Sequence, residues 1–492
     1  MPIPLLLALL IAFGLDLPGP AASAPSLPLR LLEMAGGIGL IAVLAFGLGA
    51  WVASRVSHLG YASGRVFRRY QLGSRVLTLA GLAVYGWIIS PLGWSGLVLS
   101  GWGLQGLVLV DDLAILLPYI VIQLIIWTGL FFAERAIHDR RNFPRLPLYL
   151  TLKTRQSIGL VLPVVLIFVV RQDLFSRLWP LWHQAPLAEV IELSALGFLV
   201  LACSPLFIRL AWPTRSLPDG RLRRRLERVA RRAGFRFNDL LIWDTRHLVV
   251  NACVTGVLPW FRYVLLSDAL VDTLNPAEVA AVFGHELGHV EHWHLPYFGL
   301  FFLGSLGLLS VVSEVFSVSS AWIPMMSWFP TNQPGQTSDF VEVGLLLGCL
   351  GIFFWIVFGR LSRRFERQAD IFGCKVVSCG SSHCPPHFDF EGESDSPGRQ
   401  YPPVPALCPV GIQIFASALI SVARQNGIDP QKQSWRHGSI ASRLDFLRTL
   451  QTDPAREPLF QRKLRSFRLA LSTFLLLMVA IALLAHSWDL LH

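Results

Sequence analysis

The distribution of apolar residues is the first informative feature of this chain. Long runs rich in Leu, Ile, Val, Phe and Trp recur along it, separated by shorter polar stretches. A run of about 20 apolar residues can cross a hydrocarbon core of roughly 30 Å as a helix. The pattern therefore predicts a mainly α protein built on a polytopic transmembrane helix bundle. The runs lie at 34–53, 76–100, 113–133, 188–210, 297–316, 341–358 and 469–487, with a weaker one at 157–170.

Composition strengthens this prediction. Hydrophobic residues make up 53% of the 492 positions and charged residues only 15%, which is unlike a soluble globular protein. The formal net charge is +10, and most of the excess is arginine flanking the apolar runs. Such arginines indicate membrane topology, so we expect the lipid bilayer as a partner and no nucleic acid.

The arginines also predict which segments face the cytoplasm. Segment 54–75 contains five arginines, whereas the stretch around Asp111 and Asp112 contains no Lys or Arg. The positive-inside rule places the first in the cytoplasm and the second outside. The same count places 211–295 and 359–468 in the cytoplasm, and only these inward segments are long enough for a catalytic domain. We expect a multi-pass protein of a bacterial inner membrane, with a cytoplasm-facing active site.

The chain divides into six segments on these grounds. The first is either a signal-like segment or a retained first apolar segment, because an apolar stretch is followed by the small residues Ala22-Ser23-Ala24. The two cytoplasmic segments are separated by a helix pair, so a site that uses both must form at the membrane surface. The expected segments are 1–24; transmembrane helices in 25–210; a catalytic part in 211–296; a transmembrane pair in 297–358; a second catalytic part in 359–468, with a mobile loop near 380–409; and a last transmembrane helix in 469–492.

A small β-sheet is expected in the first catalytic part. Short runs rich in Val, Leu and aromatic residues lie at Leu240–Asp244, Leu248–Val254 and Tyr263–Leu266, and are typical of strands. They follow Arg221–Phe235, which has the apolar spacing of an amphipathic helix.

Asn275-Pro276-Ala277-Glu278 has the features of a helix start. Asn is a preferred capping residue, Pro suits the first helical position, and Glu three residues after the cap completes a capping box. We expect this helix to extend to about His294. His285 and His289 are four residues apart on it, so both imidazoles can reach one ion. Glu286 lies beside them, where a general base could take a proton from zinc-bound water.

The surrounding residues discriminate between classes of zinc peptidase. A metzincin has a third histidine ten residues after the first and a glycine between, but this chain has Leu295 and His292 there, which excludes that class. A gluzincin takes a glutamate from a later helix. Glu366 and Asp370 are four residues apart on one helical face. Glu366 can ligate the ion, and Asp370 can accept a hydrogen bond from a ligating imidazole.

These motifs together resemble the integral-membrane zinc endopeptidases that include the CAAX prenyl proteases and the HtpX-type proteases. The resemblance covers about 240–300 and 359–450. It implies a cytoplasm-facing gluzincin-like catalytic domain with one Zn²⁺ per chain on His285, His289 and Glu366, and with Glu286 as the base. It depends on Val250-Asn251-Ala252, Arg262-Tyr263-Val264, the His285–His289 and Ser362–Asp370 motifs, and a later His437 with Arg443.

The resemblance also suggests how substrate is held. Asn251 and Ala252 would begin an edge strand to which the substrate backbone pairs. Arg443 would also belong to the substrate-binding residues, where it supports His437 in stabilising the oxyanion. A structural capping role for His437 is the alternative. Relatives usually have proline after this histidine, whereas this chain has Gly438.

Other histidines and cysteines have simpler interpretations. His292 and His294 are expected to be interfacial polar residues and not ligands. Cys379 and Cys384, with His387 and Cys408 nearby, could bind a second zinc, but their spacing matches no zinc ribbon. Reduced cysteines, or a disulfide that pins the loop, are the favoured alternatives, and Cys374 belongs to the same cluster.

The sequence as a whole favours a membrane-embedded zinc metalloendopeptidase that cleaves peptides or membrane proteins in quality control or processing. The alternative is a zinc-containing membrane scaffold without catalysis, but such a protein has no use for Glu286 between two ligands. Transport would require ionisable residues within the spans, and these are almost absent.

Overall fold

The computed structural model describes residues 26–59, 64–89, 91–104, 110–137, 143–169, 188–318, 348–379 and 406–489, and the single residues 8 and 107. Segment 1–24 and the expected mobile loop near 380–409 lie almost wholly outside these ranges, so the proposed domain boundaries stay predictions. The described chain is mainly helical with one small sheet, as predicted.

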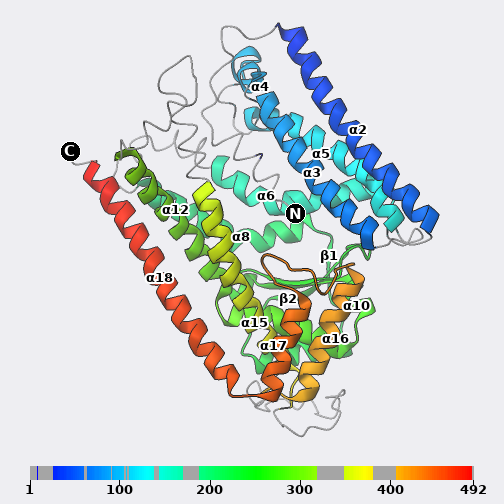
Figure 1. Ribbon diagram of the computed structural model, residues 1–492, viewed down its shortest axis with the longest axis vertical. Coiled ribbons are helices and arrows are strands. Elements are labelled where there is room, and N and C mark those ends of the chain that lie inside the picture. Colours follow the sequence, from blue (N-terminus) through cyan, green and yellow to red (C-terminus); the bar gives the residue numbers. More distant parts are fainter. Residues whose placement is uncertain are drawn as a thin grey trace.

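Among the described residues, seven long helices cover or overlap all of the predicted apolar runs except 341–358. Four of them are long and apolar enough to cross a membrane over Leu27–Leu59, Gly64–Ile89, Val110–Ile137 and Arg456–Ile481. In Figure 1, α2, α3 and α5 lie together, and α12 and α18 lie side by side. The seven are α2 (Leu27–Leu59), α3 (Gly64–Ile89), α5 (Val110–Ile137), α6 (Leu146–Val169), α8 (Ala188–Ala211), α12 (His294–Val318) and α18 (Arg456–Asp489).

Close backbone packing joins α2 to α5. A Cβ atom at Gly49 would meet the carbonyl oxygen of Gly129, and one at Gly129 would meet the backbone of Ala45. Small residues permit this approach between membrane helices, where van der Waals contact drives association. The outer faces remain apolar: Leu32 is 68% exposed and Val43 is 70% exposed, as expected for surfaces in contact with lipid.

The second span differs from its prediction of 76–100. Helix α3 begins at Gly64 and ends at Ile89, because Pro91 follows and helices usually end before a proline. The arginines expected in the preceding loop, among them Arg65 and Arg68, lie in the first turns of this helix. Two short helical pieces follow it, α4 (Trp94–Gly96) and the π-helical η1 (Leu97–Gly101).

The four-stranded sheet contains all three predicted strands and one more. Its order is β1-β2-β4-β3, with β2 parallel to β4 and β3 antiparallel to β4 at one edge. The unpredicted strand β1 has only the residues Thr-Arg-Ser, which carry no apolar pattern. The strands are β1 (Thr214–Ser216), β2 (Asp239–Trp243), β3 (Ala252–Thr255) and β4 (Tyr263–Ser267).

Both faces of the sheet are covered. Leu240, Val264 and Leu266 face the core formed with the catalytic helices. On the other face, Trp212 at the end of α8 stacks on Trp243, with ring centroids 4.2 Å apart. The sheet therefore joins the membrane helices to the catalytic helices, which explains why every residue of β4 is buried.

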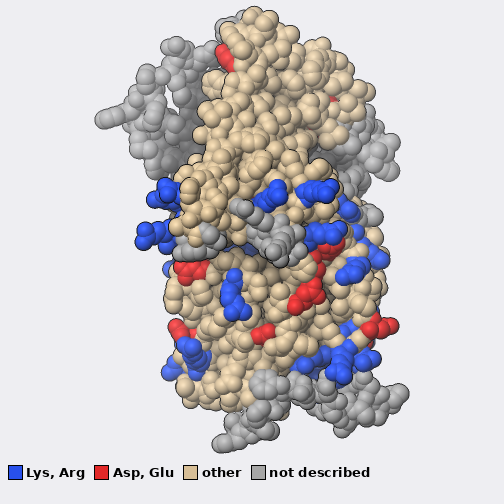
Figure 2. Space-filling model, turned by 90° about the vertical axis from the view of Figure 1, so that its right-hand side faces the viewer, with Lys and Arg blue, Asp and Glu red and all other residues tan. Residues whose placement is uncertain are grey.

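The catalytic helices come from both predicted cytoplasmic segments. Helices α9 (Arg221–Arg232), α10 (Asp268–Thr273) and α11 (Pro276–Glu291) precede the α12 helix, and α15 (Gly359–Val376), α16 (Pro409–Gln425) and α17 (Ile440–Thr452) follow it. Residues 348–353 are helical and continue through the π-helical η6 (Phe354–Phe358) into α15. On the face shown in Figure 2, Lys and Arg lie over the lower half, and the upper half is almost uncharged.

Candidate metal centre

Helix α11 begins as the sequence predicts. Asn275 accepts hydrogen bonds from the backbone of Ala277 and Glu278, the Glu278 side chain accepts one from Asn275, and Pro276 occupies the first turn. This capping box fixes where the helix starts, and therefore which face carries the histidines. The helix ends at Glu291, slightly before the predicted His294.

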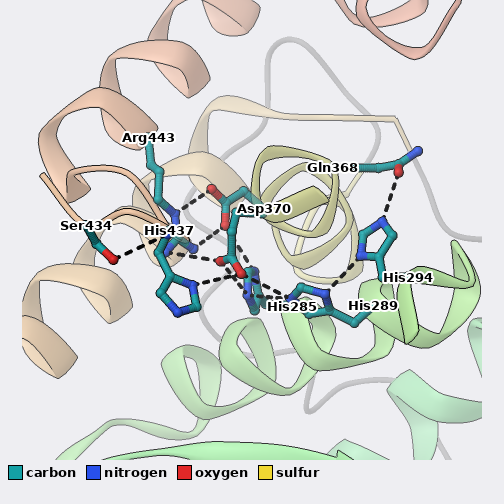
Figure 3. Close-up of polar contacts among 9 residues, drawn as sticks. His285, His289, His294, Gln368, Asp370, Ser434, His437 and Arg443 are labelled. Atoms are coloured by element: carbon teal, nitrogen blue, oxygen red, sulfur yellow. Dashed lines mark hydrogen bonds and ion pairs between the residues drawn. The ribbon is translucent and has the colours of Figure 1, made fainter. Parts of the chain in front are cut away.

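Three potential ligands meet between α11 and α15. The Nε2 atoms of His285 and His289 are 3.2 Å apart. Glu366 places one carboxylate oxygen 3.6 Å from the first nitrogen and the other oxygen 3.8 Å from the second. The ligand atoms of all three residues lie within 4.8 Å of one another. Figure 3 shows the imidazoles of His285 and His289 next to each other on their helix.

This arrangement fits a zinc ion. Tetrahedral ligands at 2.0–2.1 Å from zinc lie about 3.4 Å apart, close to the separations seen here. Two imidazoles and a carboxylate are also a ligand set of catalytic zinc, which leaves a fourth position open. The described residues thus bring the predicted ligands together, and their metal-binding role stays a prediction.

Asp370 and Arg443 lie directly behind the ligands. Asp370 is fully buried and places Oδ1 3.0 Å from Nδ1 of His285. Arg443 donates from Nε to Oδ2 of Asp370 at 2.8 Å and from Nη2 to Oδ1. Its Nη1 lies 3.5 Å from Glu366. Arg443 was predicted to bind substrate, but it is only 8% exposed and its contacts are with these two carboxylates.

The charges at the site give the carboxylates different acidities. Burial opposes ionisation of Glu366, but the hydrogen bond from His437 and the charges of His285 and Arg443 outweigh it and hold the pKa of Glu366 below its usual value. Burial likewise opposes ionisation of Asp370, yet Arg443 and His285 lower its pKa. Both groups therefore stay negative, as a cation site requires.

The pKa of Glu286 shifts in the opposite direction. Burial raises its pKa to about 7, His285 opposes this rise, and the negative charge of Glu366 adds to it. Within the described part of the chain, the ion pairs of the site are made by Glu366 and Asp370 and not by Glu286. Glu286 is therefore available to exchange a proton near neutral pH.

His437 faces the site from a tight loop. Its Nδ1 lies 2.9 Å from Glu366, and its side chain is 50% exposed. Ser434 and Gly438 exchange two backbone hydrogen bonds across the loop, and Gly438 has a φ of 73°. Proline could neither adopt this φ nor donate the backbone hydrogen bond, so the glycine after His437 has a structural reason.

The predicted substrate strand lies at the sheet edge. In the described sheet, β3 pairs only with β4, so its other edge has no strand partner. Ala252 is the first residue of this strand, and Asn251 directly precedes it. The backbone N–H of Ser267 donates to the carbonyl oxygen of Asn251, and the backbone N–H of Asn251 donates to Oγ of Ser267. Strand β3 packs against α11, the helix that carries the expected base Glu286.

His294 is the residue that sequence reasoning misjudged. It was predicted to be an interfacial polar residue, but it is only 1% exposed. Its Nδ1 lies 2.9 Å from Nδ1 of His289, and its Nε2 lies 3.0 Å from Oε1 of Gln368. The helical pattern could not reveal this contact, because the chain turns between α11 and α12 at Trp293, whose φ is 58°.

Three cysteines of this cluster lie in the described residues. Cys374 and Cys408 are buried and Cys379 is exposed. The Sγ of Cys408 accepts the backbone hydrogen bond of Gly411 and caps α16. Cys384 and His387 lie outside the described residues, so the second zinc site suggested by this cluster stays an untested alternative.

Comparisons with known proteins agree with the site. Residues 216–382 match the family model described as Peptidase family M48. The chain is 24% identical over 229 residues to CAAX prenyl protease 1 of Saccharomyces cerevisiae, covering 44% of this chain and 49% of that protein. It is 24% identical over 194 residues to a protease HtpX homolog of Aeropyrum pernix, covering 39% of this chain and 59% of the relative. The chain thus spans about half the length of these curated relatives.

The fold has a counterpart among solved structures. The "Crystal Structure of S. mikatae Ste24p" superposes with a TM-score of 0.52 at 18% identity, covering 86% of this chain and all of that one. The resemblance found in the sequence is therefore confirmed.

Proposed function

We propose that this chain, which carries an M48 peptidase region and a Ste24p-like fold, is a zinc metalloendopeptidase that cleaves peptides or membrane proteins. One observation carries the proposal. His285 and His289 on α11 converge with Glu366 on α15 to within 4.8 Å, although a long apolar segment separates the two helices in sequence.

The residues around this centre have distinct roles in hydrolysis. A bound zinc ion would polarise the scissile carbonyl and lower the pKa of a water molecule. Glu286, whose pKa is raised to about 7, takes the proton of the attacking water and then delivers it to the leaving amine. Asp370, whose Oδ1 lies 3.0 Å from Nδ1 of His285, holds that ring in place, and Arg443 keeps Asp370 ionised.

The substrate backbone is proposed to pair with the free edge of β3, beginning at Asn251 and Ala252. This mode gives affinity through main-chain hydrogen bonds with little demand on side chains. His437 is half exposed beside Glu366, from where it can donate to the oxyanion of the tetrahedral intermediate. Arg443 supports this end of the site from behind and does not contact the substrate in this account.

We place the active site on the cytoplasmic side of a bacterial inner membrane, with quality control or processing as its task. The curated relatives are named as CAAX prenyl proteases and HtpX homologs, and general cleavage of membrane-protein segments is compatible with recognition through a strand edge. The bilayer is the second partner, and no nucleic acid is expected.

The test compares the purified full chain with its Glu286→Gln variant in lipid nanodiscs. Both should contain about one zinc per chain, because Glu286 is not a ligand. Only the wild type should cleave membrane-protein peptides at an appreciable rate, with a loss in the variant of at least about 100-fold. Equal cleavage by both proteins, or zinc well below one per chain in the wild type, would refute the proposal.

A further inference from the structure

A line of hydrogen bonds leads away from the second histidine of the metal centre. Nδ1 of His289 contacts Nδ1 of His294 at 2.9 Å, and Nε2 of His294 contacts Oε1 of Gln368 at 3.0 Å. Nε2 of Gln368 then donates to Oε1 of Gln461 on α18 at 2.6 Å. Figure 3 shows the first two contacts between α11, α12 and α15.

The chemistry of the groups allows one direction for the protons in this line. Nε2 of His289 faces the metal position, so its lone pair must be free and the ring proton must be on Nδ1. Nδ1 of His294 then accepts, and its own proton is on Nε2, which donates to the amide oxygen of Gln368. The amide nitrogen of Gln368 donates in turn to Gln461. Every donor meets an acceptor, without any charged group.

Local structure holds His294 in this position. It is the first residue of α12, directly after Trp293, whose positive φ turns the chain. A bulky residue rarely adopts this backbone conformation. The ring of His294 stacks on Phe365 with centroids 4.0 Å apart and planes 5° apart. Phe365 immediately precedes the proposed ligand Glu366 in α15.

The two proposed histidine ligands thus differ in the group that contacts their Nδ1 atom. His285 contacts a carboxylate, Asp370, that is ionised and paired with Arg443. His289 contacts a neutral imidazole. A second carboxylate at this point would add negative charge beside Glu366 and Asp370, whereas the imidazole fixes the His289 tautomer without doing so.

We propose that His294 is a positioning residue for the metal centre: it accepts the Nδ1 hydrogen bond of His289 and, through Gln368 and Gln461, ties this ligand to the C-terminal helix α18. The proposal rests on the zinc site of the proposed function. It assigns His294 a role that its place in the sequence, beyond the His285–His289 motif, does not reveal.

Two substitutions at His294 distinguish the loss of its hydrogen bond from the loss of its packing contacts. Oδ1 of asparagine occupies nearly the same place as Nδ1 of histidine, so His294→Asn keeps the acceptor for His289. His294→Leu removes the acceptor and keeps the volume. His292→Ala is the matched control, because that neighbouring side chain packs edge-on against Phe372 and is not in the line.

The measurements use the full-length protein in nanodiscs. Zinc affinity is measured by competition with a chromogenic chelator, and the visible spectrum of the cobalt-substituted protein reports the ligand field. We expect His294→Leu to weaken zinc binding by about 10- to 100-fold and to alter the cobalt spectrum. His294→Asn should recover most of the affinity, and His292→Ala should match the wild type.

Unchanged affinity and spectrum in folded His294→Leu would overturn the proposal, as would equal losses in His294→Asn and His294→Leu. If His294→Leu does not fold, Gln368→Met decides, since it removes the acceptor for His294. A weaker site and an altered spectrum support the proposal, and unchanged values overturn it. Failure of the wild type to bind zinc would instead refute the proposed function.

Discussion

Three carboxylates lie close together at the candidate centre, and their partners give them different chemistry. Glu366 and Asp370 are paired with His437, His285 and Arg443, so both remain ionised despite burial. Glu286 shares this environment but forms no ion pair with the residues that the structure describes, and burial raises its pKa to about 7. This difference supports the proposal that Glu366 and Asp370 hold charge while Glu286 exchanges a proton.

At the scale of single residues, Asp370→Asn tests whether Asp370 helps to hold the proposed ligand His285. The amide oxygen can still accept from His285, but the charge that balances buried Arg443 is lost. We expect zinc affinity to fall by about 10- to 100-fold and the free energy of unfolding by about 3 kcal/mol. Chelator competition and denaturant unfolding measure the two effects. Asp445→Asn is the control, because Asp445 forms only an exposed pair with Arg448, and equal behaviour of both variants would contradict the account.

The raised pKa of Glu286 predicts how stability depends on pH. Its pKa in the folded metal-free protein is about 7, against a usual value of 4.5, so between these values the folded state binds more protons than the unfolded state. Stability contributed by this group therefore falls as pH rises from about 4.5 to 7. Metal-free Glu286→Gln should gain in thermal midpoint over the wild type as pH increases from 5 to 8. Glu291→Gln, an exposed position on the same helix, should show a constant difference, and a constant difference for Glu286→Gln would refute the assignment.

At the scale of the elements, two glycines set the distance between α11 and α15. A Cβ atom at Gly284 would overlap Val376, and one at Gly288 would lie 3.0 Å from Cα of Ala369 and from Cβ of Phe372. These glycines lie on the helix face that carries the two histidines. Close approach of the helices is therefore a condition for Glu366 to reach the imidazoles.

Gly288→Ala should push these helices apart. We expect a loss of about 1–3 kcal/mol in the free energy of unfolding and weaker zinc binding, because Glu366 moves with α15. Gly299→Ala is the control, since no atom lies within 4 Å of its added methyl group. Unfolding and chelator competition of the two variants provide the comparison, and wild-type zinc affinity in Gly288→Ala would show that the spacing does not matter.

Local chemistry decided which elements the sequence could predict. The signals for the cap at Asn275 and for strands β2 and β4 each lie within a few consecutive residues, so the sequence pattern predicts these elements. Strand β1 is short and polar, and in the described sheet it pairs with β2 alone. The turn that buries His294 depends on a positive φ at Trp293, and such a conformation follows from tertiary packing that no local pattern records.

For the molecule as a whole, the convergence of two distant segments was predictable because each half of the site carries its own motif. Other contacts around the site were not predictable, since Arg443 with Asp370 and His294 with Gln368 join residues that lie more than 70 positions apart. Pairing across such distances depends on the complete fold.

The orientation of the whole molecule in its membrane is a further prediction. Arginine counts place Asp445 in the cytoplasm and Leu107 outside, and both side chains are exposed. In a chain whose native cysteines are replaced, Leu107→Cys should react with a membrane-impermeant thiol reagent in intact spheroplasts. Asp445→Cys should react only after permeabilisation. The reverse pattern would place the catalytic helices outside the cell.

X-ray absorption at the zinc edge of the purified, metal-loaded protein is the most direct test of the central claim. The account predicts zinc bound by two imidazole nitrogens at about 2.0–2.1 Å and by carboxylate oxygen, with no sulfur ligand. His289→Ala should lose one imidazole contribution and Glu366→Ala should lose none. A spectrum with sulfur ligands, or one that both substitutions leave unchanged, would show that zinc binds elsewhere and would contradict the account.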